Sequence, residues 1–274
     1  MELPAFPADT ARTTEGIARL RTAYDAQGFV VVRDVVPKDG LAALTSALGD
    51  ALARARSDST LFEGGGGLLA GHINCYPGEP ARFAYDALRE QGILALIAAL
   101  NPAFAAAARA GCNMNLPNSV AQNWHIDGDF YKDFAIVNVA VVDSVIQNGA
   151  IDLLPASHQQ AEPYWRLAFA RSFRSHLRVE MNRGDVLVRS SRLWHRGMPN
   201  LSRTVRPMLG FTFGEASGSS GDLFSAHGGA IQFSPNRFPT SRLGKLRERS
   251  YVAAPFAHDV LRIVRSMLGK DGYA

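Results

Sequence analysis

The feature that most constrains the fold is a series of short segments with strand-like alternation, which follow one another from about residue 110 to residue 213. Turn residues separate most of them, for example Pro117 with Asn118 and Pro199 with Asn200. Short strands at such spacing are typical of an antiparallel sandwich or jelly roll. The expected strands are 112–116, 122–126, 135–143, 150–154, 177–180, 186–189 and 208–213.

Helical patterns precede this series. Ile17, Leu20 and Tyr24 form one apolar stripe after Thr13, and Gly28 is placed to end that helix. Further helical structure is expected over 41–55 and 81–100, and strands over 29–32 and 72–77. The chain is therefore predicted to be mostly β with flanking helices.

We expect one domain over residues 1–274. Its parts would be a helix-rich segment at 1–109, a jelly-roll core at 110–214 and a carboxyl-terminal extension at 215–274. A helix with apolar residues every four positions is expected within the core, with Trp165, Phe169 and Phe173 packed on the sheet. Its arginines would lie on a solvated face or, alternatively, beside the substrate entrance.

His125 and Asp127 stand two residues apart in N-W-H-I-D-G-D. In a strand, such residues point to the same face, so an imidazole and a carboxylate could hold neighbouring positions on a metal. A buried, unpaired carboxylate would be costly, and a cation removes that cost. A third ligand must come from elsewhere, and His195 in W-H-R-G offers one. Two histidines and one carboxylate form the facial triad of non-haem Fe(II) oxygenases.

Five motifs cover most of the chain in order. They are G-F-V-V-V-R-D-V-V-P at 28–37, W-H-I-D at 124–127, N-G-A-I-D-L-L-P-A-S-H at 148–158, G-D-V-L-V at 184–188 and H-R-G-M-P-N-L-S-R-T-V-R at 195–206. Together they resemble the phytanoyl-CoA dioxygenase family of Fe(II)- and 2-oxoglutarate-dependent oxygenases, over roughly residues 15–213. The resemblance implies a double-stranded β-helix (a cupin-like jelly roll), an Fe(II) centre, and 2-oxoglutarate and O₂ as co-substrates.

The resemblance also implies roles for single residues. His125, Asp127 and His195 would be the catalytic metal ligands. His158, at the end of the P-A-S-H turn, is the rival third ligand. Because halogenating relatives replace the carboxylate ligand by Gly or Ala, the presence of Asp127 predicts hydroxylation or another C–H oxidation instead of halogenation.

The far carboxylate of 2-oxoglutarate needs a cation inside the barrel, and a guanidinium fork matches a carboxylate. In the family this arginine lies eleven residues beyond the distal histidine, where this chain has Arg206. Arg203, in the turn L-S-R-T, is the rival. Asn138 occupies a position that lines the co-substrate pocket in relatives, where it is often Trp. Gly197 stands where the family commonly has Ser.

Two other functional classes stay open at this stage. One is a non-catalytic jelly-roll binding protein. The other is a cupin-like hydrolase or isomerase that uses its metal as a Lewis acid.

The substrate is not identified by these motifs. Cys112 and Met114 are expected to line the pocket, and the run of four glycines at 64–67 is a mobile loop or a lid. Candidate side chains that face the substrate are His72, Asn74, Asp129, Tyr131 and Arg192.

Charge narrows the range of partners. Only four of the 29 basic residues are lysines, which reflects genome composition or, alternatively, a small anionic substrate. No basic stripe interleaves with aromatics, so nucleic acid is not expected. The apolar run at 93–100 is too short to span a bilayer. Two cysteines outside any C-x-x-C spacing, and an amino terminus unlike a signal peptide, predict a cytoplasmic protein with a small-molecule substrate. The oligomeric state stays open.

Overall fold

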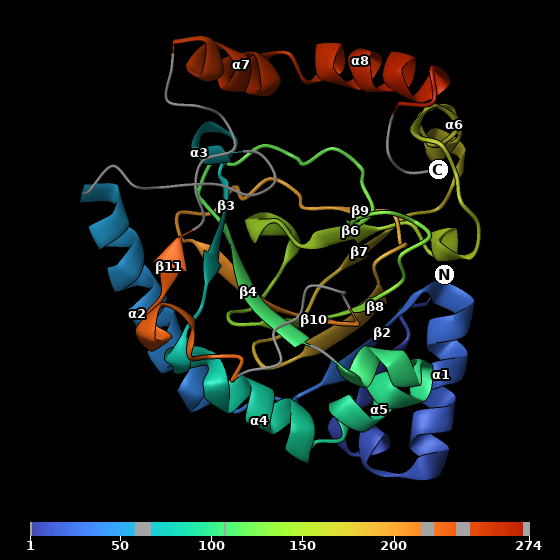
Figure 1. Cartoon of the computed structure of the whole chain (residues 1–274), viewed down its shortest axis with the longest axis vertical. Coiled ribbons are helices and arrows are strands. Elements are labelled where there is room, and N and C mark those ends of the chain that lie inside the picture. The colour runs from blue at the N-terminus through green and yellow to red at the C-terminus, as the bar shows by residue number, and fades with distance from the viewer. Residues whose placement is uncertain (1, 58–66, 107, 215–221, 234–241, 271–274) are drawn as a thin grey trace.

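A computed structural model of the chain describes residues 2–57, 67–106, 108–214, 222–233 and 242–270 (Figure 1). Within these residues, a mostly antiparallel eight-stranded sheet packs against a three-stranded sheet. The large sheet has the order β1 (Ala5–Pro7), β2 (Phe29–Arg33), β8 (Val186–Ser190), β5 (Ala135–Ala140), β10 (Arg206–Phe213), β4 (Ala108–Asn115), β3 (His72–Tyr76) and β11 (Gln232–Phe233). The small sheet has the order β7 (Leu177–Val179), β6 (Ile151–Leu153) and β9 (His195–Arg196). The expected jelly roll with flanking helices is confirmed.

Helices cover the outer face of the large sheet. They are α1 (Thr14–Gln27), α2 (Lys38–Ser57), α4 (Arg82–Glu90) and α5 (Ile93–Leu100). The hydroxyl of Thr13 accepts a hydrogen bond from Gly16 N at 3.0 Å and caps α1, as its sequence predicts. Gly28 ends α1 in the left-handed region at φ +83°, which a glycine adopts without strain. The apolar side chains of these helices are buried against alternate residues of the strands.

The inner face of the large sheet meets the small sheet. Phe29 and Leu187 lie there with Leu153 and Val179 of β6 and β7, and this core holds the two sheets together. Cys112 and Met114 do not face it. Both are buried in the outer, helix-covered core, so the expectation that they line a pocket was wrong.

The carboxyl-terminal helices lie together at one end of the molecule, drawn red at the top of Figure 1. They are α7 (Arg242–Ala253) and α8 (Pro255–Met267), and they pack on α3 (Gly67–Ala70) and α6 (Tyr164–Ala170). Glu248 of α7 accepts a hydrogen bond from Leu69 N at 2.8 Å, and Ser266 of α8 accepts one from Trp165 N at 3.1 Å. Arg171 and Asp259 add an ion pair at 2.5 Å. The extension after residue 241 is therefore fixed to the core at both of its helices.

The apolar residues that were expected to pack on the sheet are not the buried residues of α6. Phe169 and Phe173 are 61% and 91% exposed, whereas Tyr164 and Leu167 are buried. The helix is shorter than the repeat suggested and ends at Ala170, so the later positions of the stripe fall outside it. Two of the arginines that follow are paired with acidic residues: Arg171 with Asp259 at 2.5 Å and Arg174 with Glu162 at 2.6 Å.

Two further expectations concern the run of four glycines and a membrane span. Gly64 to Gly66 lie outside the described residues, and Gly67 begins α3. Among the helices that are described, none is long and apolar enough to cross a membrane.

Candidate metal centre

His125 and His195 are placed side by side by the backbone. His125 N donates to His195 O at 3.0 Å, and His195 N donates to His125 O at 2.9 Å. Residues that exchange both bonds in this way lie directly opposite each other, so their side chains project to the same face. The ring centroids are 4.3 Å apart. Trp124 and Trp194 project to the other face and are buried together, which anchors both histidines.

The strand expected at 122–126 is not formed. This stretch is irregular, and His125 alone makes an isolated bridge with His195. Asp127 is held separately, because its N–H donates to Ser191 O at 2.8 Å. The same-face arrangement of His125 and Asp127 therefore comes from two different contacts with the segment that carries His195.

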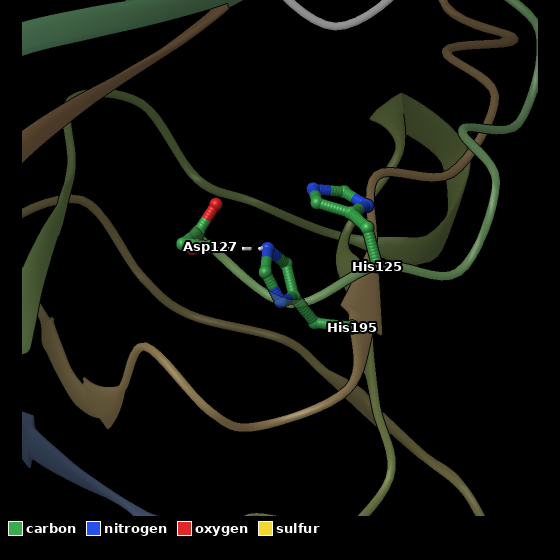
Figure 2. Close-up of side chains that lie close together, drawn as sticks. All are labelled: His125, Asp127 and His195. Carbon is green, nitrogen blue, oxygen red and sulfur yellow. Dashed lines mark ion pairs between the residues drawn. The ribbon is translucent and has the colours of Figure 1, made fainter. Parts of the chain in front are cut away.

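The three side chains converge (Figure 2). One ligand atom from each of His125, Asp127 and His195 lies within 4.8 Å of the others. His195 Nε2 is 3.4 Å from Asp127 Oδ2. Among the described residues, this is the one group of three or more such side chains with metal-binding geometry.

Hydrogen bonds set the tautomers of the two histidines. His125 Nδ1 lies 2.8 Å from Asn123 O, and His195 Nδ1 lies 2.9 Å from Leu193 O. Because a carbonyl only accepts, each Nδ1 carries the proton and each Nε2 lone pair is free. Burial lowers the pKa of both imidazoles, so they are neutral at physiological pH, which is the form that binds a metal.

Arg189 is part of the centre and was missed by sequence reasoning. Its NH1 donates to Asp127 Oδ2 at 2.6 Å, and its Nε donates to Asn138 Oδ1 at 3.0 Å. Burial alone would raise the pKa of Asp127, but Arg189, together with the two histidines, outweighs it and holds that pKa below its usual range. The signal was available, since Arg189 falls on the inner face of β8 by strand alternation.

Arg206 is buried without an acidic partner among the described residues. One of its terminal nitrogens donates to Gly149 O at 3.0 Å, and its Nε has no hydrogen-bond partner. Burial lowers the pKa of Arg206 to about 10. Arg203 is exposed. A buried cation with an unsatisfied donor is a ready site for an anion.

Gly197 replaces the expected serine for a steric reason. Its N–H donates to Gln122 Oε1 at 2.8 Å. A Cβ at this position would lie 2.8 Å from the same oxygen and 3.1 Å from His72 Cε1. A serine at this position would therefore require the end of the Gln122 side chain, and His72 beside it, to shift.

A comparison with protein-family models finds the phytanoyl-CoA dioxygenase (PhyH) model over residues 24–208. This match covers more than half of the chain. The chain belongs to the phytanoyl-CoA dioxygenase family. The match includes all three side chains of the metal centre and Arg206.

Solved structures with a similar fold are distant in sequence. The chain resembles the non-heme alpha ketoglutarate dependent carbocyclase SnoK of nogalamycin biosynthesis, with TM-score 0.57, 15% identity, and coverage of 78% of this chain and 94% of that one. It resembles AviO1 from Streptomyces viridochromogenes Tue57, with TM-score 0.56, 18% identity and coverage of 75% and 97%. It also resembles the epimerase SnoN in complex with Fe3+, alpha ketoglutarate and nogalamycin RO, with TM-score 0.52, 21% identity and coverage of 73% and 84%.

The other candidate residues of this phytanoyl-CoA dioxygenase family member lie outside the cluster. His158 packs edge-on against Tyr24 at 6.4 Å, beside the end of α1. Tyr131 is 69% exposed. Arg192 donates to Phe130 O at 2.6 Å and pairs with Asp133 at 3.5 Å. Asp129 accepts from Tyr131 N within its own turn.

His72 and Asn74 lie nearer the centre. His72 is buried, its Nε2 lies 2.8 Å from Val120 O, and its Nδ1 has no partner. It is close enough to Arg206 and His125 for their charges to lower its pKa further, after burial. Asn74 is half-exposed on the inner face of β3.

A residue far along the chain also reaches the centre. Arg262 of α8 donates to Trp124 O at 2.9 Å and stacks on the ring of Tyr164 at 3.7 Å. Trp124 directly precedes the ligand candidate His125. Nothing in the local sequence around Arg262 signalled this contact, because it depends on how α8 packs.

Proposed function

We propose that this chain is a non-haem Fe(II) enzyme that uses 2-oxoglutarate and O₂ to oxidise a C–H bond of a small organic molecule. The observation that carries the proposal is the cluster of His125, Asp127 and His195 combined with the buried cation of Arg206. The cluster offers donors to a metal, and the cation offers a partner to an anion. A binding module, or a hydrolase that uses a metal alone, needs only the first.

The donor set fits iron. Two imidazoles and one carboxylate leave further positions open on a metal, as in non-haem Fe(II) oxygenases. Each imidazole would present Nε2 to the metal, and Arg189, which donates to Asp127 Oδ2, would orient the carboxylate beside them. Bound iron supplies the reaction with O₂, which no side chain can provide. The complex of SnoN with Fe3+ and alpha ketoglutarate on a similar fold supports this choice.

Arg206 is proposed to bind the distal carboxylate of 2-oxoglutarate. Its free Nε and its remaining NH groups form the fork that a carboxylate matches. Asn138 is proposed to line the co-substrate pocket on the metal side, because it lies on the inner face of β5 and contacts Arg189. By excluding water around both groups, the protein strengthens these charged contacts.

The reaction class follows from the ligand set. Because Asp127 fills the position that halogenating relatives leave open, we propose C–H oxidation, with hydroxylation as its simplest product. The similar proteins SnoN and SnoK are an epimerase and a carbocyclase, so the fold is compatible with more than one product. The substrate is taken here only as a small organic molecule.

Anaerobic titration tests the proposal. Protein loaded with Fe(II) should develop a metal-to-ligand charge-transfer band when 2-oxoglutarate is added, and His195→Ala should not. His158→Ala is the matched control and should keep the band, since this histidine lies beside α1. A metal-loaded protein that shows no band with 2-oxoglutarate would refute the proposal, and favour the binding-module or Lewis-acid alternatives.

A further inference from the structure

Beyond the metal centre, a group of neighbouring residues on the inner faces of β5, β10, β4 and β3 is half-exposed, whereas Met208 beside them is buried. The strand register places Asn138, Gly210 and Gly111 opposite one another in one row. Asn113 and Asn74 lie opposite each other in the next row. All five are half-exposed, whereas the residues that alternate with them are buried in the helix-covered core. The surface is therefore open on the side that faces the metal centre.

Gly111 and Gly210 form the floor of this surface, and the fold does not require glycine at either position. Neither has a positive φ. A Cβ on Gly111 would meet only Gly210 O, at 3.9 Å, and one on Gly210 would come no closer than 3.5 Å to any atom, at Asn138 Nδ2. Glycine within a strand costs about 0.5–1 kcal/mol relative to Ala. Glycine inside a strand often marks a bulge, a bend, or a place where a ligand or another backbone approaches closely. The register runs unbroken through both glycines, so neither lies at a bulge, and close approach of a ligand is the interpretation we adopt.

Amide groups border the floor. Asn113 Nδ2 donates to Asn74 Oδ1 at 2.8 Å. This bond leaves two side-chain groups without a partner among the described residues: the Nδ2 amide group of Asn74 and the Oδ1 oxygen of Asn113. One donor and one acceptor are thus presented side by side to whatever lies on the floor.

The floor is continuous with the metal centre. Asn138 Oδ1 bonds Arg189, and Arg189 bonds Asp127, at 3.0 Å and 2.6 Å. Neighbouring strands lie about 4.8 Å apart, so Gly210 and Gly111 are one and two strands from Asn138. A molecule whose reacting carbon is near the metal would lie over the two glycines, and its far end would reach Asn113.

Among the charged groups on this face, the proposed function assigns Arg206 to 2-oxoglutarate, and the others already take part in interactions. Arg189 is paired with Asp127, and Arg192 with Asp133. Arg109, the next inward residue of β4 after Gly111, takes part in an interaction of its own. A hydroxyl or carboxamide can both accept from Asn74 and donate to Asn113. A carboxylate or phosphate oxygen would instead face the carbonyl oxygen of Asn113, and the resulting repulsion discriminates against anions.

We propose that the surface over Gly111 and Gly210 binds the oxidised substrate, and that this substrate is an uncharged molecule with a hydroxyl or carboxamide group for Asn74 and Asn113. The inference rests on the proposed function, since it names the substrate class of the same site. It excludes acyl-CoA thioesters, carboxylates and phosphates as the preferred class.

The test uses the Fe(II)-loaded full chain with 2-oxoglutarate and O₂, and measures succinate release above the substrate-free rate. The probes are matched pairs: methyl glucoside with methyl glucuronide, benzamide with benzoate, and cyclohexanol with cyclohexanecarboxylate, together with an acyl-CoA thioester. At least one uncharged probe should raise succinate release about tenfold or more, and its charged partner should not. Stimulation by charged probes alone, or by none of the probes, overturns the inference.

Two variants then locate the site. Gly111→Val should fold normally, because a Cβ at this position meets only Gly210 O at 3.9 Å and φ is not positive, but it should raise the KM for the stimulating probe by tenfold or more. Asn113→Leu should do the same. Gln91→Leu, an amide at the end of α4 on the outer side, is the matched control and should leave that KM unchanged. An unchanged KM in Gly111→Val overturns the inference.

Failure of the proposed function gives a different result. In that case the charge-transfer band with 2-oxoglutarate is absent from the unaltered protein. A protein that shows the band, but responds only to anions, retains the proposed function and loses the inference about its substrate.

Discussion

Replacement of Arg206 by methionine should have opposite effects with and without 2-oxoglutarate. Burial lowers the pKa of Arg206 from 12.5 to about 10. At 1.36 kcal/mol per pKa unit, the buried cation costs the co-substrate-free fold about 3 kcal/mol. Its hydrogen bond to Gly149 O returns about 1 kcal/mol. Arg206→Met should therefore keep or raise the free energy of unfolding, by up to about 2 kcal/mol, although most changes at buried positions lower it.

The same change should abolish the response to 2-oxoglutarate. Cutting a buried ion pair at one partner costs about 3–5 kcal/mol, which corresponds to a loss of affinity of roughly two to four orders of magnitude. A ligand at 100 times its Kd stabilises a protein by about 2.7 kcal/mol. Thermal unfolding of metal-loaded protein, with and without that concentration of 2-oxoglutarate, should show this increment in the unaltered chain and none in Arg206→Met.

Arg203→Met is the control, because this exposed arginine lies three residues earlier. Arg203→Met should leave the free energy of unfolding unchanged, and 2-oxoglutarate should stabilise it as much as it stabilises the unaltered chain. The reasoning fails if Arg206→Met lowers the unfolding free energy by several kcal/mol without 2-oxoglutarate, because the arginine is then structural. It also fails if 2-oxoglutarate stabilises Arg206→Met as it does the unaltered chain.

Three further outcomes are expected. His195→Ala should lose Fe(II) binding, measured by equilibrium dialysis, while its circular dichroism stays unchanged. The control His158→Ala should bind Fe(II) normally. Full binding by His195→Ala would show that the third ligand was misassigned. Arg189→Leu should weaken Fe(II) binding about 10–100-fold, because the partner of Asp127 is lost, and the loss should grow as pH falls; Arg189→Lys should recover part of it. In the folded chain the pKa of His72 is lowered to about 4, mainly by burial. As pH falls, His72 is therefore protonated in the unfolded chain near pH 6.5, well before it is protonated in the folded chain. Stability should then decline between about pH 6.5 and pH 4 by up to about 3 kcal/mol through this residue, and His72→Gln should decline less; equal slopes in denaturant titrations would contradict this.

Local features were predictable from the sequence. The helix after Thr13, its end at Gly28 and the buried strand β2 each depend on a few neighbouring residues, and all three form as predicted. The spacing of His125 and Asp127 and the resemblance to the family, which selects His195, predicted the metal cluster, and the structure brings these three side chains together.

Other features depended on tertiary packing. A period of two shows that Cys112 and Met114 share a face of β4, but not which face the helices cover, and they lie on the covered one. Likewise, Cys75 and Cys112 are distant in sequence and lie directly opposite each other on β3 and β4, both as buried thiols. The strand expected around His125 is absent: the segment makes one isolated bridge with His195, through two hydrogen bonds, and one bond from Asp127 N to Ser191 O, and these do not extend into a ladder.

The contact from α8 to the segment of His125 links two distant parts of the chain thermodynamically. Arg262 holds Trp124 O, so ordering of α8 favours the backbone position from which His125 reaches the metal. Linkage is reciprocal: a metal that requires this position must also favour docking of α8. A proteolytic cut before Pro255 would then weaken the metal site through His125, which lies more than a hundred residues away in sequence, and an occupied metal site would slow that cut.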